Sequence, residues 1–219
     1  MVDIGKLAGK PVVAVITSMA QPLGTHIGNA LEVKDAIDVL AGRTQGDLLE
    51  ISLLLGSHML VLAEKAKTLP EARAMLENAL SSGAGLRKLA EMIAAQGGDP
   101  RVVEDLSLLP QAAVKRAETA GYLSAMDTTA LGMAAQRMGA GRAKKSDMLD
   151  YSVGYVLHVR LGDEVTEDTP LATLYARNEA EAEEAEKAIR KALTIAKEKP
   201  SVPPLWDAVV TAEGITYNR

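Results

Sequence analysis

The residues best suited to chemistry are two carboxylates and the short loop that precedes them. Glu32 and Asp35 are three positions apart, so a helix through them places both side chains on one face. The loop before them, residues 23–26, can turn backbone carbonyls toward the same place. Carboxylate and carbonyl oxygens are the ligands that hard cations prefer, so this arrangement is a candidate oxygen cage. The alternative is that Glu32 and Asp35 are solvated helix charges balanced by Lys34.

The histidines do not form a recognisable catalytic set. The three of them are His26, His58 and His158. None has a ligand-like partner four positions further on, and no Ser-His-Asp or Cys-His constellation follows from the spacing. His58 lies in an apolar run and is expected to be a core histidine hydrogen-bonded to a neighbour. His158 alternates outward on a predicted strand and is expected to be exposed to solvent.

A glycine-rich basic segment, Gly-Ala-Gly-Arg-Ala-Lys-Lys at residues 139–145, has the composition of a phosphate cradle. A phosphate loop usually opens a helix, because the amide groups at a helix N-terminus point at the anion. This segment follows a predicted helix instead. We therefore favour a structural turn over an anion site.

Composition excludes several classes of protein. The chain has 219 residues and 47% hydrophobic content, enough for one large or two modest domains. Its net charge of −5 argues against an unaided nucleic-acid surface. It has no cysteine, which excludes disulfides, thiolate zinc sites and cysteine nucleophiles. The sequence shows no signal peptide and no membrane span, so we expect a soluble protein with no membrane partner, located in the cytoplasm.

The first half of the chain is predicted to be helical apart from one strand. Residues 12–17 are continuously apolar and rich in β-branched side chains, which predicts a strand covered on both faces in a mostly parallel sheet. Asn29 and Glu32 have the spacing of a capping box at the start of a helix. A nearly all-apolar helix over residues 47–65 must be buried or lie at a subunit interface. Two further helices are predicted after it.

The second half is predicted to mix strands and helices. Residues 121–127 and 151–160 have the composition of strands, with a short helix between them. A later helix begins at Asn178, with Glu181 completing a capping box.

The segment at residues 162–171 looks like the strand-turn-strand of biotinyl and lipoyl carrier domains. Such carriers need a lysine at the tip of a hairpin, and Asp127 occupies the comparable position in Ala125-Met126-Asp127. Cofactor attachment is therefore not expected, but a barrel-sandwich scaffold is.

Two segments carry a family resemblance: Val-Ala-Val-Ile-Thr-Ser-Met-Ala-Gln-Pro-Leu-Gly at residues 13–24 and Gly-Asn-Ala-Leu-Glu-Val-Lys-Asp-Ala at residues 28–36. They resemble the pyrimidine nucleoside phosphorylase and thymidine phosphorylase family, and the resemblance continues to the C-terminus. In that family such a segment lies about halfway along, so the chain looks like the C-terminal half of a phosphorylase. The expected fold class is α/β: a helix-rich partial α/β domain over residues 1–110, then an α+β barrel-sandwich domain over residues 111–219.

The resemblance also implies a function. Family members catalyse reversible phosphorolysis of thymidine or uridine, with phosphate as co-substrate, giving the free base and a pentose 1-phosphate. In the family a monovalent cation, usually potassium, is held by groups that correspond to the carbonyls of Leu23 and His26 and the carboxylate of Asp35, where members often have Glu. The phosphate-binding and base-binding residues of the family lie upstream of this chain. No catalytic or substrate-binding residue is therefore assigned here.

Two functions of different class remain open. The chain is either part of a working pentosyltransferase whose other half is a separate or removed polypeptide, or a catalytically silent fragment or interaction module that keeps the fold. A truncated sheet leaves unpaired edges, which recruit strands from other chains. We therefore expect a homodimer or an association with the missing N-terminal half.

Overall fold

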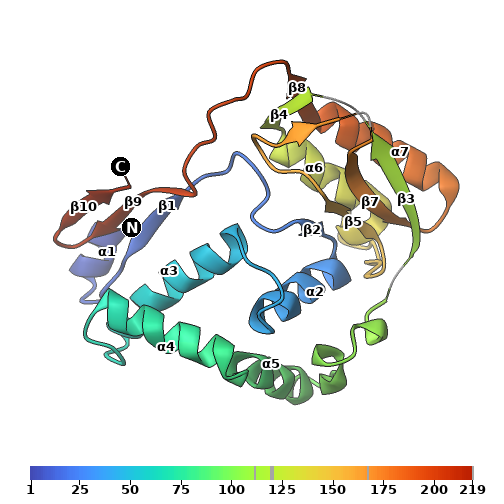
Figure 1. The fold of residues 1–219 in the computed structure, drawn as a ribbon. Helices are drawn as coiled ribbons and strands as arrows, with labels where there is room; N and C mark the ends of the chain where they lie inside the picture. Colours follow the sequence, from blue (N-terminus) through green and yellow to red (C-terminus); the bar gives the residue numbers. More distant parts are fainter. Residues whose placement is uncertain (111, 119–120, 167, 219) are drawn as a thin grey trace. The chain divides into compact units, whose positions relative to one another are not determined.

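The computed structural model describes residues 1–110, 112–118, 121–166 and 168–218. The chain divides into two compact units (Figure 1). The first comprises residues 1–18, 39–89 and 203–219, and the second comprises residues 19–38 and 90–202. Each unit is therefore assembled from separate stretches of the chain. The predicted contiguous boundary at about residue 110 falls inside the second unit and remains a prediction about domain limits.

The first unit combines a small sheet with helices. Its sheet has the order β1-β9-β10, formed by Ala14–Thr17, Trp206–Thr211 and Gly214–Tyr217. Both pairings are antiparallel. The mostly parallel sheet expected around residues 12–17 is therefore wrong for this strand. The expected cover on both faces is also wrong, because no residue of β1 is buried and Ile16 is 49% exposed. An apolar run does not specify which strand pairs with it, and here the partner is the C-terminal hairpin.

The helices of the first unit are α1 (Val2–Leu7), α3 (Asp47–Leu62), α4 (Leu69–Ser81) and the first half of α5 (Ala84–Ala95). Three of them, α3, α4 and α5, lie where helices were predicted, whereas α1 was not predicted. α3 packs along α4. Around this contact a small apolar cluster contains Val39, Leu49 and Leu53, with Leu76 and Leu80 packed against it.

The second unit carries two antiparallel sheets. One has the order β2-β5-β7-β3, formed by His26–Ile27, Gly154–Leu157, Pro170–Ala176 and Ala113–Glu118. The other has the order β6-β4-β8, formed by Glu164–Val165, Gly121–Met126 and Leu193–Ala196. Helix and sheet are thus mixed throughout the chain, in keeping with the coarse α/β prediction.

Helices α2 (Asn29–Leu40), α6 (Thr128–Ala135) and α7 (Glu179–Ala192) accompany these sheets, and α6 packs against α7. Between α5 and β3 the chain forms two short 3-10 turns, Pro100–Val103 and Leu106–Leu108. One large cluster of buried apolar side chains joins both sheets to α6 and α7. The core of this unit is therefore continuous.

Two capping predictions have opposite outcomes. The Asn178 side chain accepts a 3.0 Å hydrogen bond from the Glu181 amide at the start of α7, as predicted. The capping box at Asn29 is wrong, because α2 begins at Asn29 itself and the Glu32 amide donates to the Gly28 carbonyl. The Asn29 side-chain amide donates instead to the Ala140 carbonyl at 2.8 Å, so this residue joins α2 to the segment after α6.

Two glycines allow the start of α2 to approach β5 closely. Gly28 has a φ of 140° and Gly154 a φ of 150°. A Cβ atom built on Gly154 would lie 2.2 Å from the Ile27 carbonyl oxygen, and one on Gly28 would lie 2.5 Å from the Val153 carbonyl oxygen. Any larger residue at either position would push the two backbones apart. These glycines therefore fix the place of the loop and helix that carry the candidate site.

Candidate functional site

The candidate cation site lies at the edge of the four-stranded sheet, where the chain passes from a loop through β2 into α2. His26 pairs with Val156 on β5, and the Leu157 amide donates to the Thr25 carbonyl at 2.9 Å. Because hydrogen-bonded pairs alternate along an antiparallel ladder, the His26–Val156 pair is a non-bonded one. The His26 carbonyl therefore points away from β5, at the outer edge of the sheet.

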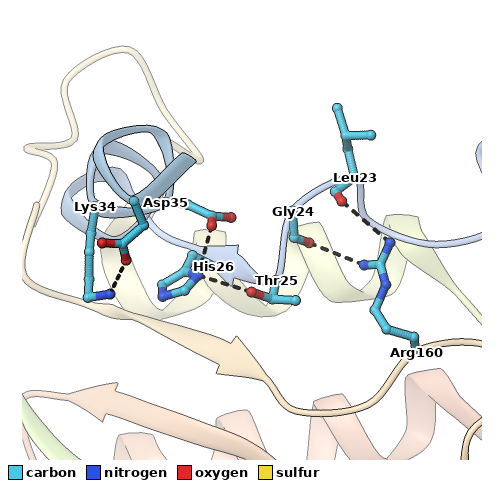
Figure 2. Close-up of polar contacts among 8 residues, drawn as sticks. Leu23, Gly24, Thr25, His26, Lys34, Asp35 and Arg160 are labelled. Atoms are coloured by element: carbon cyan, nitrogen blue, oxygen red, sulfur yellow. Dashed lines mark hydrogen bonds and ion pairs between the residues drawn. The ribbon is translucent and has the colours of Figure 1, made fainter. Parts of the chain in front are cut away.

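The side chains of His26 and Asp35 lie together (Figure 2). The His26 Nδ1 atom is 3.5 Å from the Asp35 carboxylate and 3.0 Å from the Thr25 hydroxyl. Burial lowers the pKa of His26, although the Asp35 carboxylate acts in the opposite direction by favouring the protonated ring. At neutral pH the imidazole is therefore neutral.

The two carboxylates of the candidate cage have different surroundings. Asp35 is only 3% exposed, so the alternative in which it is a solvated helix charge does not hold. Glu32 is exposed and lines a pocket of about 280 Å³ together with Gln136 and Gly141. Lys34 does not balance Asp35; its ammonium group lies 2.5 Å from the carboxylate of Asp38, which is also buried. α2 thus buries two acidic side chains, one facing a lysine and the other facing a neutral histidine.

The Leu23 carbonyl faces an arginine. Figure 2 shows the carbonyl oxygens of Leu23 and Gly24 turned toward the guanidinium of Arg160. The Arg160 Nη2 atom is 3.4 Å from the Leu23 oxygen, and Nη1 is 2.6 Å from the Pro22 oxygen and 3.5 Å from the Gly24 oxygen. Nothing in the sequence pointed to this contact, because Arg160 lies more than a hundred positions after the loop.

These groups suit a hard monovalent cation in their chemistry. The donor set is oxygen only, and a buried carboxylate beside a neutral ring gains free energy from a nearby positive charge. Among the residues that the structure describes, no cluster of three or more His, Cys, Asp or Glu side chains has the geometry of a metal site. A site here would therefore depend on backbone carbonyls more than on side chains.

The remaining candidates have structural partners. Gly139 adopts a φ of 107° within a π-helical turn, Gln136–Ala140. The Asp147 carboxylate accepts hydrogen bonds from the amides of Ala143 and Lys144, at 3.1 and 2.8 Å. An internal carboxylate thus occupies the place that an anion would take, which supports the structural turn. Asp127, at the position where carrier domains have lysine, caps α6 by accepting a 2.8 Å bond from the Ala130 amide.

The other two histidines differ from each other. His158 is exposed, as predicted, with Nε2 at 2.6 Å from the Thr173 hydroxyl. His58 is half-buried on α3, and within the described part of the chain its buried Nε2 atom has no hydrogen-bond partner. The predicted neighbour bond is therefore missing at this nitrogen. Burial lowers the pKa of His58.

Across the described residues, no helix is long and apolar enough to cross a membrane.

Comparison with known proteins identifies clear relatives. Residues 122–196 match the model of the pyrimidine nucleoside phosphorylase C-terminal domain. A pyrimidine-nucleoside phosphorylase of Bacillus subtilis is 50% identical over 182 residues, and that of Geobacillus stearothermophilus is 49% identical over 182; each match covers 82% of this chain and 42% of the relative. The Staphylococcus aureus USA300 protein of the same name is 42% identical over 214 residues, 96% of this chain and 49% of the relative. The chain thus spans about half the length of the curated relatives it matches.

Proposed function

Because the chain belongs to the pyrimidine nucleoside phosphorylase family, we propose that it contributes to the phosphorolysis of pyrimidine nucleosides. The reaction uses phosphate to release the free base and leaves a pentose 1-phosphate. The observation that carries this proposal is the 42–50% identity to proteins named pyrimidine-nucleoside phosphorylase, over 82–96% of the chain.

In this proposal the chain supplies supporting architecture. We place the groups that bind phosphate and the pyrimidine in the part of the relatives that this chain does not span. The described residues contribute the loop, the edge strand β2 and the start of α2, on a unit with a continuous core. The reaction needs substrates held in a fixed geometry, and a rigid element next to the reacting part serves that need.

We include a potassium ion in the proposal. The carbonyls of Leu23 and His26 and the carboxylate of Asp35 would hold it, and when bound it would supply positive charge that fixes the loop against α2. Support comes from the buried carboxylate of Asp35, which faces a neutral imidazole, while its neighbour Asp38 faces Lys34.

We further propose that the two sheets of the second unit form a barrel-sandwich. Buried side chains of both sheets enter one cluster, including Leu123 and Val165 from one sheet and Leu157 and Leu174 from the other. Two antiparallel sheets that share inner side chains are the arrangement of a sandwich.

Association and location complete the proposal. β1 is an edge strand, and α3 exposes a row of apolar side chains. Both features favour as a partner either a second copy or a polypeptide that corresponds to the unmatched half of the relatives. We place the protein in the cytoplasm, because a chain with no cysteine suits a reducing compartment.

The test is phosphate-dependent release of thymine or uracil, measured for the chain alone and after mixing with a polypeptide that corresponds to the unmatched half of the Bacillus subtilis relative. We expect release only in the mixture, and only when phosphate is present instead of sulfate. Activity of the chain alone would show that it holds its own reacting groups. A stable mixture without activity would favour the alternative, a catalytically silent interaction module.

A further inference from the structure

One guanidinium group contacts three successive backbone carbonyls of the loop. Arg160 donates to the oxygen of Pro22 at 2.6 Å. Its contacts to the oxygens of Leu23 and Gly24, drawn in Figure 2, are longer, at 3.4 and 3.5 Å. Carbonyls that converge on one positive group form the same kind of cradle that binds a metal cation. In this chain a side-chain cation already lies at that cradle.

The position of Arg160 is fixed by the turn that follows β5. The Arg160 amide donates to the Asp163 carboxylate at 2.7 Å, and the Asp163 amide donates back to the Arg160 carbonyl at 3.1 Å. These two hydrogen bonds hold the backbone of Arg160 in a turn, and this limits where its guanidinium can lie. Its side chain is half-buried, where charge interactions are stronger than in bulk water.

The loop has other anchors besides the guanidinium. On one side, the Leu161 amide donates to the Gln21 side-chain oxygen at 2.9 Å. On the other side, the Leu157 amide donates to the Thr25 carbonyl at 2.9 Å. Both bonds use backbone amides that remain when residue 160 is changed. Removal of the guanidinium should therefore change the charge next to the loop but leave the backbone conformation of the loop largely unchanged.

We propose that Arg160 is a positioning residue that sets the cation affinity of this site, because its guanidinium competes with the bound cation for the Leu23 carbonyl. This inference rests on the proposed potassium site. Two positive charges that share one carbonyl oxygen lie within roughly 6 Å of each other, and at an effective dielectric constant of about 20 to 80 their repulsion weakens binding by about 3- to 100-fold. The cation site is thus held at lower affinity than its oxygen ligands alone would give.

The experiment is a titration of the full chain with KCl at constant ionic strength, balanced with choline chloride. Hydrogen–deuterium exchange of the amides of residues 21–27 reports binding locally and does not depend on activity. Arg160→Gln removes the charge and should lower the half-saturating KCl concentration about tenfold. Arg160→Lys keeps the charge and should stay within about threefold of the unmodified chain.

Two outcomes overturn the inference while leaving the cation site intact. One is a half-saturating concentration that is unchanged or higher in Arg160→Gln, which would make the arginine only a clamp on the loop. The other is an equal decrease of the half-saturating KCl concentration in Arg160→Lys. That result would assign the effect to the planar shape of the guanidinium and not to its charge. If the glutamine variant does not fold, Arg160→Met removes the same charge and takes its place in the titration.

Asp35→Asn separates the two proposals. If potassium protects the loop and Asp35→Asn abolishes this protection, the cation site is correct and the Arg160 variants test the competition alone. If KCl has no effect beyond that of choline chloride, or has the same effect in Asp35→Asn, the proposed cation site fails and the competition fails with it.

Discussion

Helices α3 and α7 differ in composition, and their burial is the reverse of what composition alone would suggest. α3 is apolar along most of its 16 residues, yet Leu55, Met59 and Leu62 remain 42%, 68% and 37% exposed. α7 is rich in Glu and Ala, yet it buries Ala182, Ala185, Ile189 and Ala192 in the main cluster. Apolar content therefore did not decide which helix is fully packed.

The difference is one of periodicity. The buried residues of α7, which include Ala182, Ala185 and Ile189, recur at three- and four-residue spacing and form one stripe. Its charges pair along the helix on the other side, as in Arg190 with Glu186 at 3.1 Å. α3 has few polar residues, and although it packs on α4 it leaves the apolar side chains of Leu55, Met59 and Leu62 exposed. An excess of apolar surface of this kind is typical of interaction sites.

The largest effect should come from shortening a buried side chain of α7. Ile189 is 1% exposed in the main cluster, so Ile189→Ala should lower the free energy of unfolding by about 2–5 kcal/mol through lost burial and the cavity that remains. Met59→Ala on α3 is the matched control and, at a concentration low enough to keep the chain monomeric, should change it by less than about 0.5 kcal/mol. Denaturant unfolding followed by circular dichroism measures both. Equal losses in the two variants would mean that Met59 is packed in solution.

The second effect concerns the exposed face of α3. If Leu55, Met59 and Leu62 contact a second copy, Met59→Glu should weaken self-association at least tenfold, about 1.4 kcal/mol, because a charge would be buried in an apolar contact. Sedimentation velocity over a range of concentrations measures this. Glu183→Gln, an exposed change on α7, should leave the association unchanged. A chain that stays monomeric at high concentration would contradict the expected association.

Much of the fold could be predicted from the sequence, because local signals determine helices. The helical pattern and capping residues located α4, α5, α6 and α7, and Asn178 caps α7 as its spacing indicated. Strand partners were harder, because pairing depends on residues far apart: β1 pairs with β9, which lies near the other end of the chain. Asn29 failed as a cap for the same reason, since its partner Ala140 is 111 positions away.

The candidate site was predictable only in part. The carbonyl-rich loop and Asp35 could be found from the sequence, and the structure brings Asp35 to His26. The sequence did not predict that Glu32 is exposed and Asp35 is buried, because helical spacing places two residues on one face but does not show which neighbours cover them. Arg160 could not be found either, since a single sequence contains no signal for a contact between segments so far apart.

The smallest effect is the pH dependence of α3. His58 has a lowered pKa in the folded chain because it is buried, and its Nε2 atom lacks a hydrogen-bond partner among the described residues. In the unfolded chain the ring titrates near about 6.5. Below that pH the unfolded state binds more protons than the folded state, so the free energy of unfolding should fall as the pH drops from about 6.5 toward the folded pKa, and level off below it.

His58→Gln should make this fall smaller, because the position no longer titrates. Ser52→Ala, an exposed change on the same helix, is the control: neither residue titrates, so this change should leave the slope nearly unchanged. Denaturant unfolding at a series of pH values between about 5 and 8 measures the slope in each variant. If His58→Gln keeps the full slope, the folded and unfolded states protonate this ring alike, and α3 must accommodate a charged imidazole that the packing around Nε2 does not provide for.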